Sequence, residues 1–297
     1  MFVNAIEKVT EFTRPVHTIQ RFFGESKVIS GAATLFFVND EGWALTCRHV
    51  AELFIAANLL QQRYQAFKAE QNVLFGKKKR IFKFIIEKVL ERKYDFGRGK
   101  VVELKNLLVN CIDGPLGLQI LLHPELDVAL LKFENYTSLL STSFPIFAVN
   151  GDNLKQGRSL CRLGFPFPEF TNFSYESKTD SIDWNDQGRT DTPRFPIDGM
   201  VTRHITGPSG AFIGFEMSTP GLRGQSGGPA FDMDGRIWGM QSATNHLDLN
   251  FDVDMEVIRN GHKKRISNNA FLHVGHCVHV DVLKSFMREH KVYFAEG

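Results

Sequence analysis

The sequence predicts a mostly β globular protein with helical insertions. Three observations support this class. Apolar runs of strand length recur along the chain, separated by Gly, Pro, Asn and Asp. The 297-residue chain is 43% hydrophobic and 23% charged, which suffices for one or two cores and excludes a disordered protein. Two long segments depart from the strand pattern, which indicates insertions.

The first 27 residues are expected to form a short helix and a lead-in. Apolar residues between Asn4 and Phe12 recur close to helical spacing, and Pro15 should end that helix. We place a first β domain at residues 28–145. It begins with a hairpin whose second arm, Trp43 to Cys47, delivers His49.

An insertion is expected within the first domain, at about residues 51–105. Its first part, 51–71, has no Gly or Pro and predicts a long amphipathic helix. Residues 77–105 hold eleven basic and four acidic residues. We interpret this charge as a solvated face and keep a docking surface for an activating protein as the alternative. No RNA-binding signature accompanies it, so we expect no nucleic-acid partner.

A second β domain is expected at residues 146–297. Residues 157–166 should form the strand that opens it, and residues 169–198 predict a loop with seven acidic and three basic residues. The two oppositely charged insertions could steer substrate or contact each other. A helix from about Val280 to His290 should close the domain.

The most informative stretch is residues 224–229, which read GQSGGP. Glycines allow a sharp turn that brings two backbone N–H groups toward one point. An attack by the Ser226 hydroxyl on a carbonyl would place negative charge there, so Gly224 and Ser226 predict an oxyanion hole.

A serine nucleophile requires a base and a carboxylate that orients the base. His49 lies in TCRHVA and Asp127 in LDVALL, each at the end or start of an apolar run. Together with GQSGGP, in the order His, Asp, Ser, these stretches resemble the trypsin-like serine peptidases, in particular the HtrA-like and related intracellular bacterial branch. The resemblance spans about residues 29–286.

This resemblance implies two six-stranded antiparallel β-barrels of the chymotrypsin type, with a catalytic cleft between them. His49 and Asp127 would belong to the first barrel and Ser226 to the second. No PDZ-sized segment follows the second barrel, so the chain departs from the HtrA architecture.

The resemblance also implies the residues that bind substrate. Pro220 falls at the pocket floor, where no carboxylate is present to pair with a substrate Lys or Arg. Gln241 favours a neutral polar or small side chain before the cut, whereas Arg223 at the rim favours an acid. The complete set expected to bind substrate is Pro220, Gly221, Arg223, Gln241, Ser242, Thr244 and Gly275.

Gln225 replaces the aspartate with which many secreted relatives pair a newly cleaved N-terminus. We therefore expect an enzyme that needs no activation peptide, competent as synthesised or switched by a partner. His273, His276, Cys277 and His279 match no zinc spacing, and alternate faces of a strand would separate them. We expect no metal and no cofactor.

Four cysteines without a C-x-x-C pair indicate free thiols in a reducing compartment. Glu7 and Lys8 interrupt the first apolar run before a signal-peptide core could form, and no apolar stretch is long enough for a membrane span. The net charge of +2 gives no reason to expect a membrane partner. We expect a cytoplasmic protein.

The sequence thus predicts a serine endopeptidase that acts on a protein or peptide through His49, Asp127 and Ser226, selectively and in a regulatory role. The alternative is a protease-fold binding module that is catalytically silent or activated by a partner. An esterase acting on small acyl groups is a third hypothesis.

Overall fold

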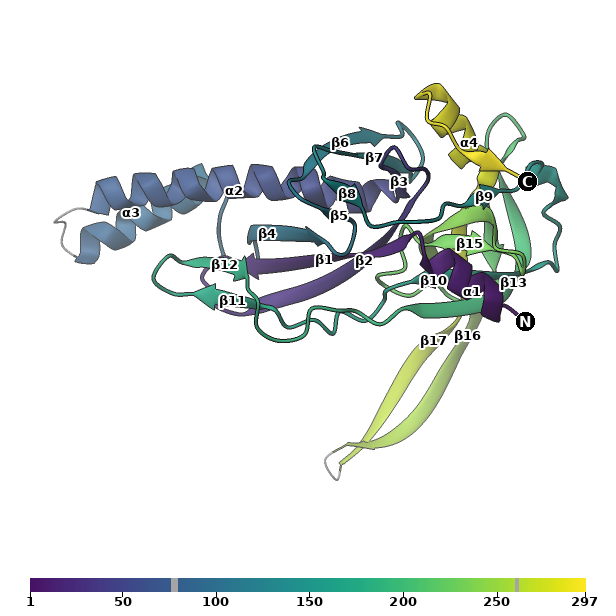
Figure 1. Cartoon of the computed structure of the whole chain (residues 1–297). Coiled ribbons are helices and arrows are strands. Elements are labelled where there is room, and N and C mark those ends of the chain that lie inside the picture. The colour runs from purple at the N-terminus through teal and green to yellow at the C-terminus, as the bar shows by residue number, and fades with distance from the viewer. Residues whose placement is uncertain (76–79, 260–261) are drawn as a thin grey trace.

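The computed structural model describes residues 1–75, 80–259 and 262–297. The fold is mostly β, with two main sheets and helices at their edges (Figure 1). The helices are α1 (Val3–Thr10), α2 (Arg48–Phe75), α3 (Arg80–Lys93), the 3-10 turn η1 (Gly151–Asn153) and α4 (Val280–Glu289). The strands are β1 (Thr13–Phe22), β2 (Val28–Phe37), β3 (Trp43–Thr46), β4 (Val101–Leu108), β5 (Ile112–Asp113), β6 (Gly117–Leu122), β7 (Ala129–Glu134), β8 (Ser138–Leu139), β9 (Ile146–Phe147), β10 (Ser159–Gly164), β11 (Phe173–Glu176), β12 (Ser181–Trp184), β13 (Phe195–Thr206), β14 (Phe212–Met217), β15 (Pro229–Phe231), β16 (Arg236–Arg259), β17 (His262–His279) and β18 (Ala295–Glu296).

The first sheet is antiparallel, with the strand order β4-β1-β2-β3-β7-β6, and it curls into a half-barrel. Strand β1 is not among the elements predicted from the sequence. Its residues were expected to belong to the segment that leads into the first domain, and Pro15 was expected to end the preceding helix. The helix α1 ends earlier, at Thr10, and Pro15 lies within β1 opposite Thr34. Val16 and Ile19 of β1 are fully buried, and this packing stabilises the strand despite its polar residues.

The second sheet has the order β15-β10-β13-β14-β17-β16-β9-β18 and closes into a ring through an additional β15–β16 pairing. The ring consists of six strands, all paired antiparallel: β15, β10, β13, β14, β17 and β16. Strands β9 and β18 add to it outside the ring, with β9 parallel to β16 and β18. The two sheets nevertheless agree with the fold that the resemblance implies. Strands β16 and β17 continue beyond the ring as a long hairpin that projects from the body (Figure 1).

Helices α2 and α3 form an arm: α2 runs along the first sheet and packs on β4, and the far end of the arm extends beyond the sheet (Figure 1). Helix α2 has 28 residues, more than the predicted 51–71. The insertion is shorter than the expected 51–105, because β4, which begins at Val101, belongs to the first sheet. Lys77, Lys78 and Lys79 lie outside the described residues. A small hydrophobic core stabilises the arm and packs it against β4. Its buried residues are Tyr64, Phe67, Leu90, Phe96 and Val102.

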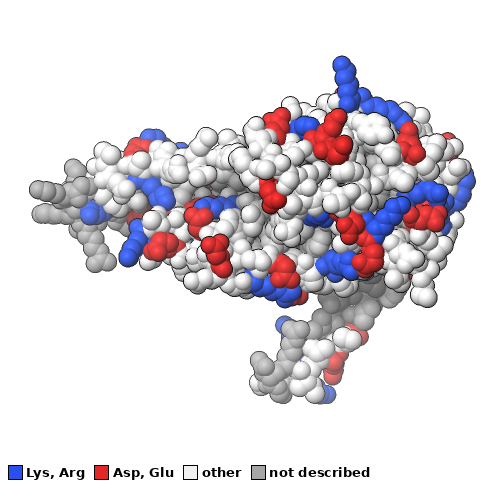
Figure 2. All heavy atoms as spheres, in the orientation of Figure 1, with Lys and Arg blue, Asp and Glu red and all other residues white. Residues whose placement is uncertain are grey.

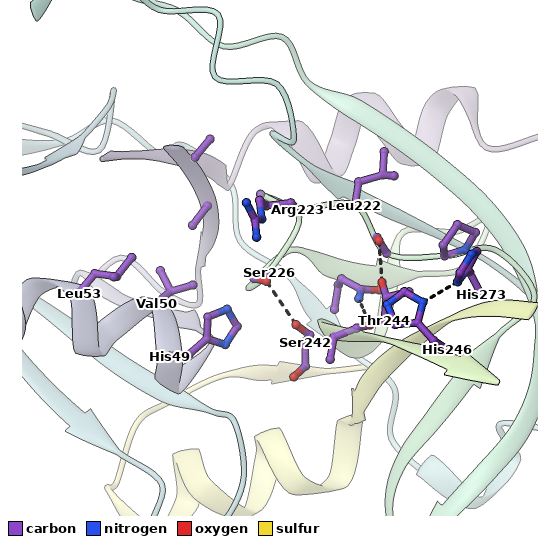
Figure 3. Close-up of a pocket in the computed structure, with 17 residues that line it drawn as sticks. His49, Val50, Leu53, Leu222, Arg223, Ser226, Ser242, Thr244, His246 and His273 are labelled. Atoms are coloured by element: carbon purple, nitrogen blue, oxygen red, sulfur yellow. Dashed lines mark hydrogen bonds between the residues drawn. The ribbon is translucent and has the colours of Figure 1, made fainter. Parts of the chain in front are cut away.

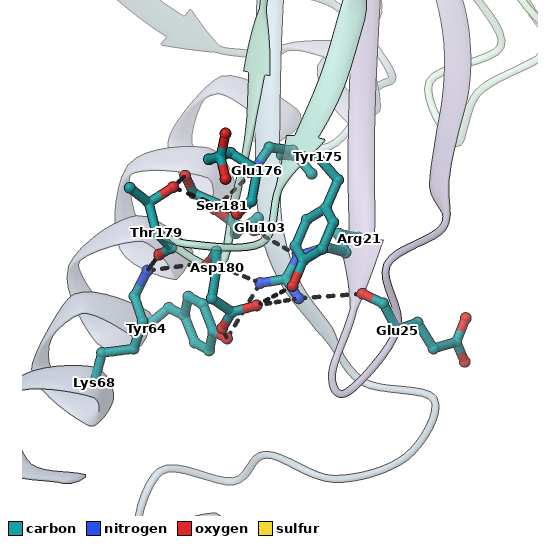
Figure 4. Close-up of polar contacts among 11 residues, drawn as sticks. Arg21, Glu25, Tyr64, Lys68, Glu103, Tyr175, Glu176, Thr179, Asp180 and Ser181 are labelled. Carbon is teal, nitrogen blue, oxygen red and sulfur yellow. Dashed lines mark hydrogen bonds and ion pairs between the residues drawn. The ribbon is translucent and has the colours of Figure 1, made fainter. Parts of the chain in front are cut away.

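The acidic segment 169–198 is not only a loop, because β11 and β12 pair within it and β13 begins at Phe195. This β11–β12 hairpin contacts the arm (Figure 4). Asp180 accepts hydrogen bonds from Tyr64 and Tyr175 and pairs with Arg21 at 3.0 Å. Arg21 is 1% exposed and also binds Glu103 at 2.6 Å. Lys105 of the basic segment pairs with Asp183 of the acidic segment at 3.0 Å, so opposite charges of the two segments meet there.

Lys and Arg are interspersed with Asp and Glu over the face seen in Figure 2. All four cysteines, Cys47, Cys111, Cys161 and Cys277, are free and buried. Among the described residues, no helix combines the length and the apolar character that a membrane crossing demands.

Candidate active site

A cleft of about 590 Å³ brings together parts of both sheets (Figure 3). From the first half come Ala32 and Ala33 of β2 and His49 in the first turn of α2. From the second half come Ser226, in the turn before β15, and Ser242 of β16. Two motifs thus face one cavity: GQSGGP, in the turn before β15, and TCRHVA, at the start of α2.

His49 is held by Asp127, which lies just before β7. The ring Nδ1 lies 2.9 and 3.0 Å from the two carboxylate oxygens, and the backbone N–H of His49 donates to Oδ1 at 3.0 Å. This double attachment orients the imidazole, and it makes Nδ1 the protonated nitrogen when the ring is neutral. Nε2 is then left with a lone pair that can accept a proton.

Ser242 completes the surroundings of the carboxylate. Its hydroxyl donates a short hydrogen bond to Asp127 Oδ2. Burial alone would raise the pKa of Asp127, but the hydrogen bonds from His49 and Ser242 lower it, to about 2. Asp127 is therefore ionised at neutral pH and can stabilise a protonated His49. From the sequence we expected Ser242 to bind substrate, and its hydrogen bond to Asp127 was not predicted.

The Ser226 hydroxyl lies in the same cleft but donates to the carbonyl oxygen of Ser242, at 3.2 Å (Figure 3). No hydrogen bond joins it to His49 among the described residues. Ser226 is half-buried, whereas the side chain of His49 is 50% exposed. Hydrogen bonds between a catalytic nucleophile and its base are often absent or long in sites without substrate.

The turn before Ser226 has a conformation that requires glycine. Gly224 has φ +101°, and a Cβ on it would lie 2.7 Å from the Phe165 carbonyl oxygen. Thr34 of β2 fixes the turn, since its hydroxyl donates to the Gly224 carbonyl at 2.8 Å and its N–H to the Ser226 carbonyl at 2.9 Å. Within the described chain, the N–H groups of Gly224 and Ser226 have no acceptor. Both donors are thus free for an anionic ligand.

The buried side chain of Gln225 also stabilises the turn that carries Gly224 and Ser226. Its side chain is fully buried, accepts from the Leu222 N–H at 3.0 Å and donates to the Phe195 carbonyl at 3.1 Å. A neutral amide thus satisfies both neighbours without any ion pair. From the sequence we inferred only that Gln225 cannot form an ion pair with a newly cleaved N-terminus.

The expected substrate residues lie mostly around the cleft. Pro220, Gly221, Arg223, Gln241, Ser242 and Thr244 line it. Gly275 does not; it donates its N–H to the Thr219 carbonyl at 2.8 Å, behind the lining. The Thr244 hydroxyl donates to the Gly221 carbonyl at 2.6 Å and so links the two walls (Figure 3). Gln241 is only 2% exposed.

Two histidines that the sequence did not place in the cleft also line it. His246 and His273, opposite each other on β16 and β17, have their Nδ1 atoms 2.5 Å apart.

Cys47, His49 and Asp127 form a separate group of possible metal ligands, whose donor atoms all lie within 4.8 Å of one another. Burial raises the pKa of the Cys47 thiol well above its usual value, and the thiol donates to the Gln241 carbonyl. Cys47 is therefore a protonated core residue and a poor metal ligand.

Comparison with known proteins identifies the family. The model of the trypsin-like peptidase domain matches residues 33–240. The chain therefore belongs to the trypsin-like peptidases, which confirms the resemblance inferred from the three motifs. No curated protein matches the chain.

Solved structures of HtrA-type proteases are similar at a distance. A variant of the HtrA-type protease AlgW with a tripeptide has 13% sequence identity and a TM-score of 0.47, over 97% of this chain and 62% of the other. AlgW with a decapeptide has 11% identity and a TM-score of 0.46, over 97% of this chain and 66% of the other. The chain thus spans less than two thirds of the length of these proteins.

Proposed function

We propose that the chain is a serine endopeptidase with His49, Asp127 and Ser226 as its catalytic residues. The observation that carries this proposal is the attachment of His49 Nδ1 to Asp127, at 2.9 Å, beside the Ser226 hydroxyl in one cleft. Membership of the trypsin-like peptidase family supports the same chemistry.

In the proposed reaction, the Ser226 hydroxyl turns from Ser242 toward His49 and attacks the substrate carbonyl. Its proton passes to His49 Nε2, and Asp127 stabilises the imidazolium. The proton then moves to the departing amine as the C–N bond breaks, which leaves an acyl-enzyme. Water attacks this ester with His49 again as base, and Ser226 recovers its proton.

The oxyanion of each tetrahedral intermediate would bind the N–H groups of Gly224 and Ser226. The absence of other acceptors for these groups in the described chain supports this role. Thr34 and Gln225 hold the turn in place before substrate arrives. Such preorganised donors supply a large part of the rate enhancement in acyl transfer.

An extended peptide fits the free edge of β16. This strand pairs with β17 on one side and with β15 and β9 on the other, but the latter pairings end at Met240. From Ser242 to Thr244 the described strand offers its outer edge to the cleft. Backbone hydrogen bonds to such an edge bind a peptide independently of its sequence.

The test is incubation of the purified chain with a diverse peptide library, followed by identification of new termini by mass spectrometry. We expect cleavage, and Ser226→Ala should lower the rate by roughly four to six orders of magnitude. Ser209→Ala, an exposed serine outside the cleft, is the matched control and should cleave normally. Equal rates for the wild-type chain and Ser226→Ala would remove Ser226 from the mechanism.

A binding module that is silent until a partner activates it is the second candidate. It is favoured by the Ser226 hydroxyl facing Ser242 and by the α2–α3 arm, which offers a docking surface for a cytoplasmic partner protein. A fluorophosphonate probe separates the two candidates, because a competent nucleophile and oxyanion hole react with it whereas a silent module does not. Hydrolysis of small esters without cleavage of any peptide would favour an esterase instead.

A further inference from the structure

Arg162 of β10 lies directly behind the wall of the cleft, with 0% exposure. Its Nη1 donates to Gln241 Oε1 at 2.5 Å. Its Nη2 donates to the carbonyl and hydroxyl of Thr219, at 3.0 and 2.6 Å, and to the Pro220 carbonyl at 3.2 Å. Every one of these acceptors is a neutral group.

The positive charge of Arg162 is therefore not neutralised by any carboxylate in the described part of the chain. The contrast is Arg21, equally buried, which pairs with Glu103 and Asp180. Glu216 is a buried acid of the same sheet, but it is paired with Arg203. A buried unpaired charge is costly, and burial lowers the pKa of Arg162 accordingly. An anionic group bound in the cleft would compensate this charge.

Arg162 also determines which way the Gln241 amide faces. Because the guanidinium donates to Oε1, the amide nitrogen must point to the other side. Nε2 donates to the Ala243 carbonyl at 2.6 Å, and a Cβ on Gly221 would lie 2.2 Å from it. Gln241 thus places an N–H donor between two residues that line the cleft, with a positive charge behind it.

Besides His49, the described lining of the cleft holds one exposed arginine, two histidines and many apolar residues. Arg223 is exposed at the rim, and His246 and His273 stand on the hairpin side. No acidic residue belongs to the described lining. The Thr244 hydroxyl donates to the Gly221 carbonyl and so holds Gly221 against β16. An anionic side chain of the substrate satisfies the charge.

Resting on the peptidase function proposed above, we propose that the pocket formed by Pro220, Gly221 and Gln241 selects substrates with Asp or Glu immediately before the scissile bond. The substrate carboxylate accepts from the Gln241 amide and compensates the charge of Arg162 behind it. Arg162 acts as a positioning residue, since Gln241 separates it from the substrate.

The experiment measures kcat/KM for peptides that differ only in the residue before the cut: Glu, Gln, Asp, Asn, Ala and Lys. We expect Glu over Gln and Asp over Asn by about tenfold or more, with Lys slowest. Arg162→Met retains the length but not the charge and should bring the Glu to Gln ratio near one. Arg162→Lys should keep part of the preference. Arg158→Met, which removes an arginine paired with Asp232 away from the cleft, should leave the ratio unchanged.

Fluorophosphonate labelling is measured in parallel, because it reports on Ser226 without any substrate side chain. Labelling and peptide cleavage with a Glu to Gln ratio of one, or with Ala preferred, would overturn the specificity proposal and leave the peptidase standing. A chain that neither labels nor cleaves would overturn both. Should Arg162→Met fail to fold, Gln241→Met removes the N–H donor instead, and an unaltered ratio in that variant would also contradict the proposal.

Discussion

Ser242 touches two of the proposed catalytic residues, but its relationship to Asp127 is the one that can be tested in isolation: its hydroxyl donates to the Asp127 carboxylate, while its carbonyl accepts from Ser226. A substitution of the side chain removes the first contact and keeps the second. Ser242 is therefore a residue of the catalytic machinery as well as of the substrate edge.

Ser242→Ala should lower kcat by about tenfold, with little change in KM, because Asp127 loses a hydrogen bond to its ionised form. Steady-state kinetics on a cleaved peptide provides the measurement. Ser138→Ala removes a similar serine-to-aspartate hydrogen bond, to Asp113, far from the cleft and serves as the control. A kcat identical to that of the wild-type chain would show that this contact does not support Asp127.

Gln225→Ala should lower kcat by between about tenfold and a hundredfold, because the turn carrying Gly224 loses its internal brace. The circular dichroism spectrum should remain that of the wild-type chain. Gln156→Ala, which removes a hydrogen bond to the Thr202 carbonyl on the surface, should have no effect on kcat. If Gln225→Ala were as active as the wild-type chain, the turn would be held by Thr34 alone.

Glu103→Gln should lower the free energy of unfolding by about 3 kcal/mol, because Arg21 is left buried with less compensation. Urea denaturation measures the loss. Glu256→Gln breaks an exposed ion pair with Lys263 and should change stability by well under 1 kcal/mol. Similar losses in the two variants would contradict the structural role given to the Arg21 network.

His17 predicts a dependence of stability on pH. It is fully buried, stacks on Phe170 with ring centres 3.9 Å apart and hydrogen-bonds the Thr192 hydroxyl at 2.7 Å. Burial lowers its pKa from 6.5 to about 4, so the unfolded chain binds a proton more readily than the folded one between these values. The stabilisation is complete above pH 6.5 and is lost as the pH falls toward 4.

Urea denaturation at several pH values checks this expectation. The wild-type chain should lose up to about 1.4 kcal/mol per pH unit more than His17→Gln within that window. Comparing the two slopes removes the contribution of other histidines. Parallel slopes would mean that His17 titrates normally in the folded chain.

The three motifs could be found from sequence because each catalytic residue type is flanked by short apolar or glycine-rich stretches with a strong local pattern. Those stretches determine strand β3, which leads to His49 at the start of α2, strand β7, which follows Asp127, and the turn that carries Ser226. Strand β1 could not be found, because Arg14, Pro15 and His17 interrupt its alternation and the partners that bury it lie far along the chain. The same holds for the hairpin of β11 and β12, whose stability depends on the arm.

Arg162 shows how far the residues around the cleft can be predicted from the sequence. An arginine in a strand ordinarily predicts an exposed position, and only the neighbouring carbonyls of Thr219 and Pro220 reveal a buried one. The rotamer of Ser226 was equally beyond prediction, since it depends on the Ser242 carbonyl. Sequence located the residues, whereas the contacts among them required the three-dimensional arrangement.

The central claim is that Ser226 is a nucleophile activated by His49. The most direct measurement is tandem mass spectrometry of the purified chain after reaction with a fluorophosphonate. We expect a single adduct on Ser226, no adduct in Ser226→Ala and labelling slowed by orders of magnitude in His49→Ala. An unmodified Ser226, or equally fast labelling without the imidazole, would contradict this claim.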